Sequence, residues 1–380
     1  MTSLPSRRRL LTTGAGAALS LGALGATASP ASSAAPRKPP TNSGSEETRT
    51  LDELYHDALA EGGKLVVYAG GDLANSGSGA SARTAFRARF PEIDLQLIVD
   101  YSKYHDVRID NQFATGTLVP DVVQLQTLQD FTRWKREGRL LHYKPAGFSK
   151  LHRSFRDSDG AWISAAVIAF SYVYDIAAAG ANAPQSPLDL VDPRWKGKVA
   201  SSYPHDDDAV LYLYALYAEK YGWDWMAALA AQQPQFARGS FSPSTAINNK
   251  TAVVGLGTGA SATATTGIRM GMPDGHPFMA WGQRLAIFKQ AANPTAAKLF
   301  LNWQISTERQ TSSSWSVRTD VAAPTGLRPV WEYPNANVDG FPRFMEDRAK
   351  VEQLKQTFAL YFGEVKGDPT PGWLGLHPGA

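Results

Sequence analysis

Short apolar runs alternate with amphipathic stretches along this chain, and that alternation limits it to few folds. Residues 64–69, 93–99 and 120–125 are strand-like runs, and the segments around them carry apolar residues at helical spacing. A repeated strand–helix succession is typical of a parallel sheet flanked by helices. We therefore expect an α/β fold, with ligands bound beyond the carboxyl ends of the strands.

The pattern continues into a second region of the chain. Trp162–Asp175 is the longest β-compatible run, and we expect it to cross between two lobes. Further strands are predicted at 198–203, 252–257 and 285–289, and an amphipathic helix at 294–310. About 335 residues follow the leader, more than one hydrophobic core usually covers, so two lobes are expected. The expected division is lobe 1 at 50–165 with 280–315 returning to it, and lobe 2 at 166–279 with C-terminal helices of 316–380 packing on the lobes.

The N-terminal segment has the pattern of an export signal. Arg7, Arg8 and Arg9 precede Leu-Leu and an uncharged Ala/Gly/Leu/Ser/Thr run, which is typical of a twin-arginine signal peptide over 1–35. A membrane anchor is the alternative, but it needs about 20 strongly apolar residues, and four glycines interrupt this run. Residues 36–49 are predicted to be a disordered tether. We expect a periplasmic or secreted protein.

Composition excludes several classes of function. The chain has no Cys, so disulfides, thiolate metal sites and cysteine nucleophiles are absent. Without the three leader arginines, the basic residues number 35 and equal the 35 acidic ones, which argues against nucleic acid as a partner. No nucleophile elbow, nucleotide loop or paired metal-ligating His motif is present, so we predict no enzyme activity, no cofactor and no metal site.

Five segments in a fixed order resemble the type II periplasmic solute-binding proteins of ABC transporters, in the family that includes ferric-iron, thiamine and phosphonate receptors. They are Lys64–Gly70, Pro120–Val123, Trp195–Val199, Ala291–Trp303 and Ser306–Gln310. The resemblance implies two lobes, joined by crossing strands, that close on a ligand and are then recognised by a membrane permease. We also expect a monomer that delivers a small molecule.

One departure from the family concerns iron. Its ferric receptors place two adjacent tyrosines shortly after the strand that corresponds to residues 252–257. Here that position is occupied by 258–266, which offers hydroxyls and backbone N–H groups in place of phenolates. We therefore do not expect the ferric site usual in that family.

The candidate ligand-binding residues follow predicted strands or lie on the crossing run. They are Gly71, Asp72, Gln126, Thr127, Tyr172, Tyr203, Asp206, Asp207, Thr258, Ser261 and Trp281. Each has an alternative structural role. The acids at 206–208 are also the residues that cap a helix, while Tyr172 and Trp281 also suit a packed core.

Two functions from different classes remain open at this point. The first is an exported receptor that captures a small organic, cationic or oxyanionic solute for an ABC importer. The second is a secreted enzyme that carries a metal or cofactor through the twin-arginine route. A diffusible binder that serves no transporter is a third reading.

Overall fold

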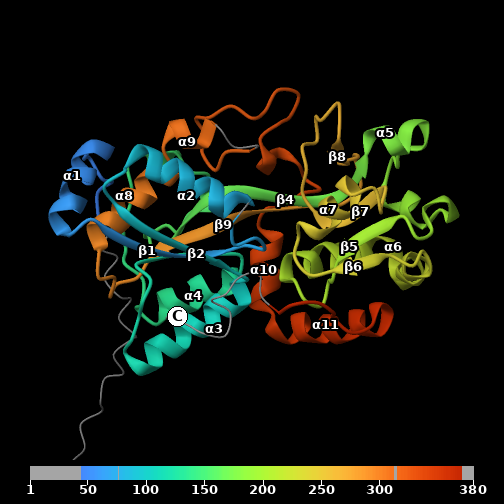
Figure 1. The fold of residues 1–380 in the computed structure, drawn as a ribbon, viewed down its shortest axis with the longest axis horizontal. Coiled ribbons are helices and arrows are strands. Elements are labelled where there is room, and N and C mark those ends of the chain that lie inside the picture. The colour runs from blue at the N-terminus through green and yellow to red at the C-terminus, as the bar shows by residue number, and fades with distance from the viewer. Residues whose placement is uncertain (1–43, 76, 312–314, 370–380) are drawn as a thin grey trace, which may run out of the picture. The chain divides into compact units, whose positions relative to one another are not determined.

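Nine strands form one mixed sheet in the computed structural model, which describes residues 44–75, 77–311 and 315–369 (Figure 1). Their order is β2–β1–β3–β9–β4–β7–β5–β6, and β8 pairs with β4. The bounds are β1 Lys64–Gly70, β2 Asp94–Asp100, β3 Val122–Leu125, β4 Ile163–Asp175, β5 Val199–Ser202, β6 Gln235–Ala237, β7 Val254–Thr258, β8 Ile268–Met270 and β9 Met279–Ile287. The predicted α/β class is confirmed.

Helices follow most of the strands, as the alternating pattern predicts. Their bounds are α1 Leu51–Glu61, α2 Gly77–Arg89, α3 Ser102–Thr115, α4 Leu128–Arg136, α5 Ile176–Ala179, α6 Asp208–Ala231, α7 Ser242–Asn248, α8 Pro294–Gln304, α9 Thr307–Thr311, α10 Gly340–Glu346 and α11 Arg348–Phe362. Helix α6 is interrupted at Gly222, whose φ of 82° lies in the left-handed region that glycine tolerates.

Strands β4 and β9 connect two groups of parallel strands. In the first group β1 pairs parallel with β2 and β3, and in the second β5 pairs parallel with β6 and β7. Residues 163–170 of β4 pair antiparallel with β9, and residues 171–174 pair with β7. Figure 1 shows β4 and β9 running together between the groups. We call β1–β3 with α1–α4 and α8 the first lobe, and β5–β8 with α6, α7 and α11 the second lobe.

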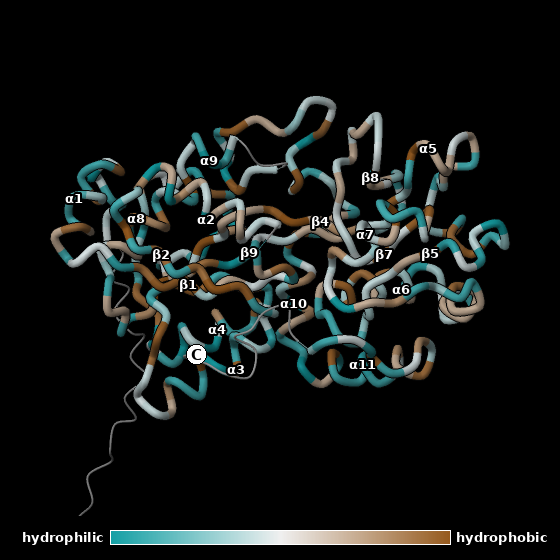
Figure 2. Tube along the Cα trace, viewed as in Figure 1, coloured by the Kyte–Doolittle hydropathy of each residue, from teal (hydrophilic) through white to brown (hydrophobic). Residues whose placement is uncertain are grey.

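Apolar side chains concentrate on the strands and on the inner faces of the helices. Figure 2 shows β1 and β4 as largely hydrophobic, whereas α3 and α11 are mostly hydrophilic along their length. One core cluster includes Phe131, Trp134 and Phe288 of the first lobe, and another includes Tyr214 and Tyr217 of α6. The fully buried strand pattern of β9 and β7 is what a sheet covered on both faces requires.

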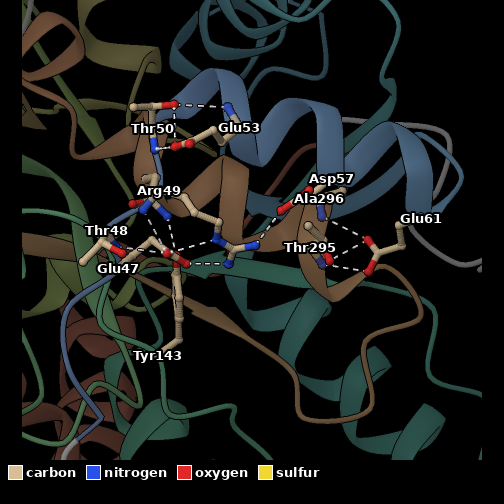
Figure 3. Close-up of polar contacts among 11 residues, drawn as sticks. Glu47, Thr48, Arg49, Thr50, Glu53, Asp57, Glu61, Tyr143, Thr295 and Ala296 are labelled. Atoms are coloured by element: carbon tan, nitrogen blue, oxygen red, sulfur yellow. Dashed lines mark hydrogen bonds and ion pairs between the residues drawn. The ribbon is translucent and has the colours of Figure 1, made fainter.

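The chain is bound to the first lobe before the first helix begins (Figure 3). The Glu47 carboxylate accepts hydrogen bonds from the Arg49 guanidinium at 2.6 Å and from the Tyr143 hydroxyl at 2.9 Å, and the Arg49 bond is the main reason its pKa falls to about 2. Thr50 then caps α1 in a capping box with Glu53. The expected tether of 36–49 therefore ends earlier than residue 49, because Glu46 and Glu47 both bind the lobe.

Helix α1 also holds the returning segment of the chain. The Glu61 carboxylate accepts hydrogen bonds from the backbone N–H groups of Thr295 at 2.9 Å and Ala296 at 3.1 Å, at the N-terminus of α8 (Figure 3). A carboxylate at this position satisfies N–H groups that have no partner within the helix. Residues distant in sequence are thereby fixed in one lobe.

The C-terminal helices pack on helices of both lobes. Helix α10 packs against α4, α6 and β9, and α11 packs along α6. Tyr212 of α6 lies against the rings of Phe341 and Phe344, at centroid distances of 5.5 and 5.1 Å. The predicted signal peptide of 1–35 lies outside the described residues. Within the described part of the chain, no helix combines the length and apolar character that crossing a membrane requires.

Candidate functional site

A cavity of about 490 Å³ lies between the loops that end the parallel strands of the two lobes. The first lobe contributes residues that follow β1, β2 and β3, and the second contributes residues that follow β5, β6 and β7. The crossing strands add residues 166–168 and Phe170 of β4, and Trp281 and Gln283 of β9. This volume falls in the range of about 300–1,000 Å³ that is usual for small-molecule sites.

Eight of the eleven candidate residues line the cavity, and three do not. Those in the lining are Gly71, Asp72, Gln126, Thr127, Asp206, Asp207, Thr258 and Trp281. Tyr172 lies beyond the crossing, where β4 pairs with β7, and its buried hydroxyl donates to the Pro184 carbonyl at 3.3 Å. Tyr203 is buried against the Phe236 ring at 5.1 Å, and Ser261 is exposed past the end of β7.

Three polar contacts join the lobes across this cavity. The Asp72 carboxylate accepts from the Ser240 hydroxyl at 2.6 Å and from the Phe241 N–H at 3.0 Å. The Lys103 ammonium donates to the Asp206 carboxylate at 2.5 Å and to its backbone carbonyl at 2.7 Å. The third contact is the Gln126 amide, which donates to Asp207 at 3.2 Å.

The turn after β1 can approach α3 only because residue 70 has no side chain. A Cβ at Gly70 would lie 2.1 Å from the Ser102 hydroxyl oxygen. The same hydroxyl accepts the backbone N–H of Gln126 at 3.0 Å, so Ser102 connects the ends of β1 and β3. This packing places Asp72 and Gln126 at one edge of the first lobe.

A buried network beneath the cavity fixes the start of α3. The Arg108 guanidinium forms a 3.0 Å ion pair with Asp100, and Asp100 accepts the backbone N–H of Tyr101 at 2.8 Å. His105 accepts from Arg108 at 2.9 Å through Nδ1, and its Nε2 donates to the Ile98 carbonyl. Burial first, and then the charge of Arg108, lower the pKa of His105 to about 3, so the imidazole is neutral. Tyr101 and Lys103 reach the cavity from this support.

Three consecutive acids of the second lobe have different partners. Asp206 is paired with Lys103 and with Arg238, whose guanidinium lies 3.1 Å away. Asp208 is paired with Lys355 of α11 at 3.0 Å. Asp207 is the N-cap of α6 and accepts the N–H groups of residues 209 and 210 through Oδ1, at 2.8 and 3.1 Å. The expected capping role is therefore present, and the same residue lines the cavity.

Asp72 and Asp207 have raised pKa values. Burial raises the pKa of Asp207 to about 6, and the negative charge of Asp72 adds to the effect. Burial also raises the pKa of Asp72, against the lowering effect of its bond from Ser240. The Tyr101 phenol has a raised pKa as well, because it is partly buried and close to Asp72, Asp206 and Asp207. The site thus brings several acidic groups close together.

Replacing Asp207 with Asn is expected to stabilise the protein at neutral pH. The ordinary pKa of an aspartate is 3.8, so ionised Asp207 costs stability as the pH rises from about 4 to about 6, and the cost is complete above that. Asn still caps a helix but carries no charge. We expect Asp207→Asn to raise the unfolding free energy by about 1–3 kcal/mol at pH 7.5, and the difference to vanish near pH 4, in urea titrations.

The exposed Glu219 of α6 provides the control for this prediction, because Glu219→Gln removes the same charge away from the cavity. Its difference from the wild type should stay small at every pH. The charged and titratable groups around Asp207 are Asp72, Tyr101, Lys103, Asp206, Asp208, Arg238 and Lys355. An Asp207→Asn variant that is less stable than the wild type at pH 7.5 would contradict the assignment.

Several cavity residues were not anticipated from the sequence. Tyr101 and Lys103 follow β2, and Ser240 and Phe241 follow β6. The rule that identified Asp72 and Gln126, the carboxyl end of a parallel strand, applies equally to β2. Gln283 and Arg309 also line the cavity, and no local sequence pattern marks them.

The side chains of the described residues do not form a metal centre at this site. No group of three or more His, Asp or Glu side chains there is arranged to hold a metal ion. Tyr101 is the single tyrosine among the described residues that line the cavity, so the paired phenolates of a ferric site are not assembled.

Comparisons with known proteins agree with this arrangement. Residues 119–264 match the sequence model of a family described as bacterial extracellular solute-binding protein. No curated protein sequence matches the chain. Solved structures of similar fold include iron-bound HitA from Pseudomonas aeruginosa, with 17% identity and a TM-score of 0.58 over 78% of this chain and 99% of that one.

Two further structures extend the comparison. AfuA from Actinobacillus pleuropneumoniae, solved with fructose-6-phosphate, has 17% identity and a TM-score of 0.61 over 79% of this chain and 99% of that one. A substrate-binding protein of an ABC transporter from Agrobacterium tumefaciens has 16% identity and a TM-score of 0.63 over 79% and 94%. The fold of the chain is that of the type II periplasmic binding proteins.

Proposed function

We propose that this chain, whose residues 119–264 match the extracellular solute-binding family, is an exported receptor that captures a small solute between its lobes and delivers it to the permease of an ABC importer. The observation that carries the proposal is the cavity itself. Its lining comes from the strand ends of both lobes and from the two crossing strands. A ligand held there would contact both lobes at once and would favour their closed arrangement.

The contacts across the cavity support such a closing mechanism. Asp72, Lys103 and Gln126 of the first lobe bind groups of the second through side chains that are only partly buried. Polar contacts of this kind contribute a modest net free energy, about 0.5–1.5 kcal/mol each. Closure would therefore be reversible, and the ligand would set the equilibrium between the open and closed arrangements of the lobes.

The proposal includes location, partner and state of association. The family match favours a periplasmic or secreted protein, and the paired arginines of the leader favour the twin-arginine route. The receptor would act as a monomer, without enzymatic turnover. A ferric ion held by two adjacent tyrosines is not part of the proposal, because the cavity lacks that pair within the described residues.

A binding and closure experiment tests the receptor function. The purified protein is titrated in thermal shift and calorimetry with sugars, sugar phosphates, amines, phosphate and Fe(III)-citrate, and small-angle scattering is recorded with and without each solute. We expect one solute class to bind saturably, to raise Tm and to reduce the radius of gyration, without chemical change of the solute. Turnover of a solute, or the absence of saturable binding by every class, would contradict the proposal.

A further inference from the structure

Acidic residues outnumber basic ones in the described lining of the cavity. Asp72, Asp206, Asp207 and Asp208 line it, against Lys103 and Arg309. A phosphate or carboxylate ligand would meet this excess of like charge, which is unfavourable. The charge balance therefore favours a cation.

Asp72 and Asp207 lack a cationic partner within the described residues, whereas the other two acids have one. Asp206 and Asp208 are neutralised by ion pairs within the protein, the first by Lys103 and Arg238 and the second by Lys355. Asp72 is bound only by neutral donors, the Ser240 hydroxyl and backbone N–H groups. Asp207 is likewise bound by N–H groups and by the Gln126 amide. An ionised carboxylate that is bound by neutral donors alone keeps its charge uncompensated.

The geometry of Asp207 leaves one oxygen for a ligand. Its three hydrogen bonds, from Gln126, Ala209 and Val210, all end on Oδ1. In the described part of the chain, Oδ2 accepts no hydrogen bond. Asp72 faces the same cavity from the other lobe, and the repulsion between the two acids contributes to the raised pKa of Asp207. A positive group between them would relieve that repulsion.

A second, independent observation points to an organic ligand with a polar part. Gln283 is only 5% exposed and lines the cavity, and its Oε1 accepts from the indole N–H of Trp281 at 3.2 Å. Its amide Nε2 meets no acceptor among the described residues. This donor stays accessible from the cavity, so an acceptor on the ligand can take its hydrogen bond.

Aromatic rings complete the environment that an organic cation requires. Tyr101, Phe170, Phe241 and Trp281 line the cavity. The Lys103 ammonium already lies 5.6 Å from the Tyr101 ring centroid, so a positive charge is accommodated beside this ring. Aromatic faces bind ammonium groups and exclude hydrated metal ions, and the described residues form no cluster of metal ligands.

We infer that the cavity selects a small organic cation, an amine or quaternary ammonium solute that also carries a hydroxyl or carbonyl acceptor. The cation is bound between Asp72 and Asp207 against the Tyr101 ring, and the acceptor is bound by Gln283. This inference rests on the receptor function proposed above and names its substrate class.

Matched solutes test the class of ligand. Choline is compared with 3,3-dimethylbutan-1-ol, its uncharged isostere, and glucosamine with glucose, while spermidine, glucose 6-phosphate and Fe(III)-citrate extend the range. Dissociation constants are measured by calorimetry on the purified wild type and on Asp72→Asn, Asp207→Asn and Glu219→Gln. We expect a cation to bind at least tenfold more tightly than its uncharged match, and each cavity variant to weaken it about 10- to 100-fold. The Glu219→Gln variant should bind like the wild type.

The outcomes separate the two proposals. Saturable binding of a neutral or anionic solute, unaffected or strengthened in the Asn variants, would overturn the cationic class and leave the receptor function standing. Cation binding that both Asn variants retain in full would also overturn the inference. If no solute in any class binds, both proposals fail. Circular dichroism at each pH shows that the variants are folded, and Asn retains the helix-capping role of Asp207.

Discussion

Asp100→Ala is expected to lower the free energy of unfolding by about 3–5 kcal/mol, because it removes the buried carboxylate that forms an ion pair with the Arg108 guanidinium. The side chains of the pair are 0% and 6% exposed, so water cannot replace the lost carboxylate. The variant also removes the acceptor of the Tyr101 N–H. Urea titration at pH 7.5 measures the effect as a lower midpoint.

A double variant separates this charge effect from loss of packing. Asp100→Ala/Arg108→Met removes both charges and keeps an unbranched apolar side chain at 108. We expect it to regain part of the lost stability, since replacing both partners of a buried pair costs less than removing one. A single variant with less than about 1 kcal/mol of destabilisation would show that the network does not support α3 in solution.

The network has a functional consequence because of where α3 begins. Tyr101 and Lys103 lie within one turn of Asp100, and both line the cavity. Fixing the backbone at Tyr101 therefore fixes two of the groups that a ligand would meet from the first lobe. The Asp100–Arg108 pair therefore affects the site by positioning Tyr101 and Lys103, and it does not contact the ligand itself.

The first-lobe half of the site could be predicted from the sequence because it depends on strand ends alone. The apolar runs at 64–69 and 120–125 each stop at polar residues, and parallel strands carry such residues to one edge of the sheet. Asp72, Gln126 and Thr127 were placed in the cavity by that reasoning. It requires no knowledge of side-chain register.

The errors arise where function depends on register or on distant chain segments. Tyr172 was expected at the crossing, but β4 shifts register between Ser171 and Tyr172, and Tyr172 belongs to the second-lobe core. The cavity takes its β4 residues from 166–170 instead. A one-residue change in register exchanges the two faces of a strand, and the sequence of β4 is apolar on both.

Other residues carry too little local signal to be found. Strand β6 has only three residues, so no period-2 pattern marks its end, where Ser240 binds Asp72. Arg309 reaches the cavity from the short helix α9, which follows the returning helix α8. Its place depends on how that segment packs, and not on its neighbours in sequence.

A substitution in the crossing strand β9 is also expected to have a large effect on stability and binding. Trp281 of β9 is fully buried, and its ring lies 5.0 Å from Phe170 of β4 and 5.5 Å from Phe341 of α10, between ring centroids. It lines the cavity and donates its indole N–H to Gln283 at 3.2 Å. One side chain thus packs the two crossing strands against a C-terminal helix and orients a cavity amide.

Trp281→Ala is expected to lower the unfolding free energy by about 3–5 kcal/mol and to abolish binding of whichever solute binds the wild type. The stability loss comes from the void left by the indole, and the binding loss from the enlarged cavity and the released Gln283. Trp134→Ala is the matched control, because Trp134 is equally buried, between Phe131 and Phe288, and does not line the cavity. Urea titrations should give similar losses of stability for both variants, and calorimetry below the unfolding transition should show binding only in Trp134→Ala. If both variants lose binding equally, then Trp281 acts through stability alone and the crossing strands do not shape the ligand site.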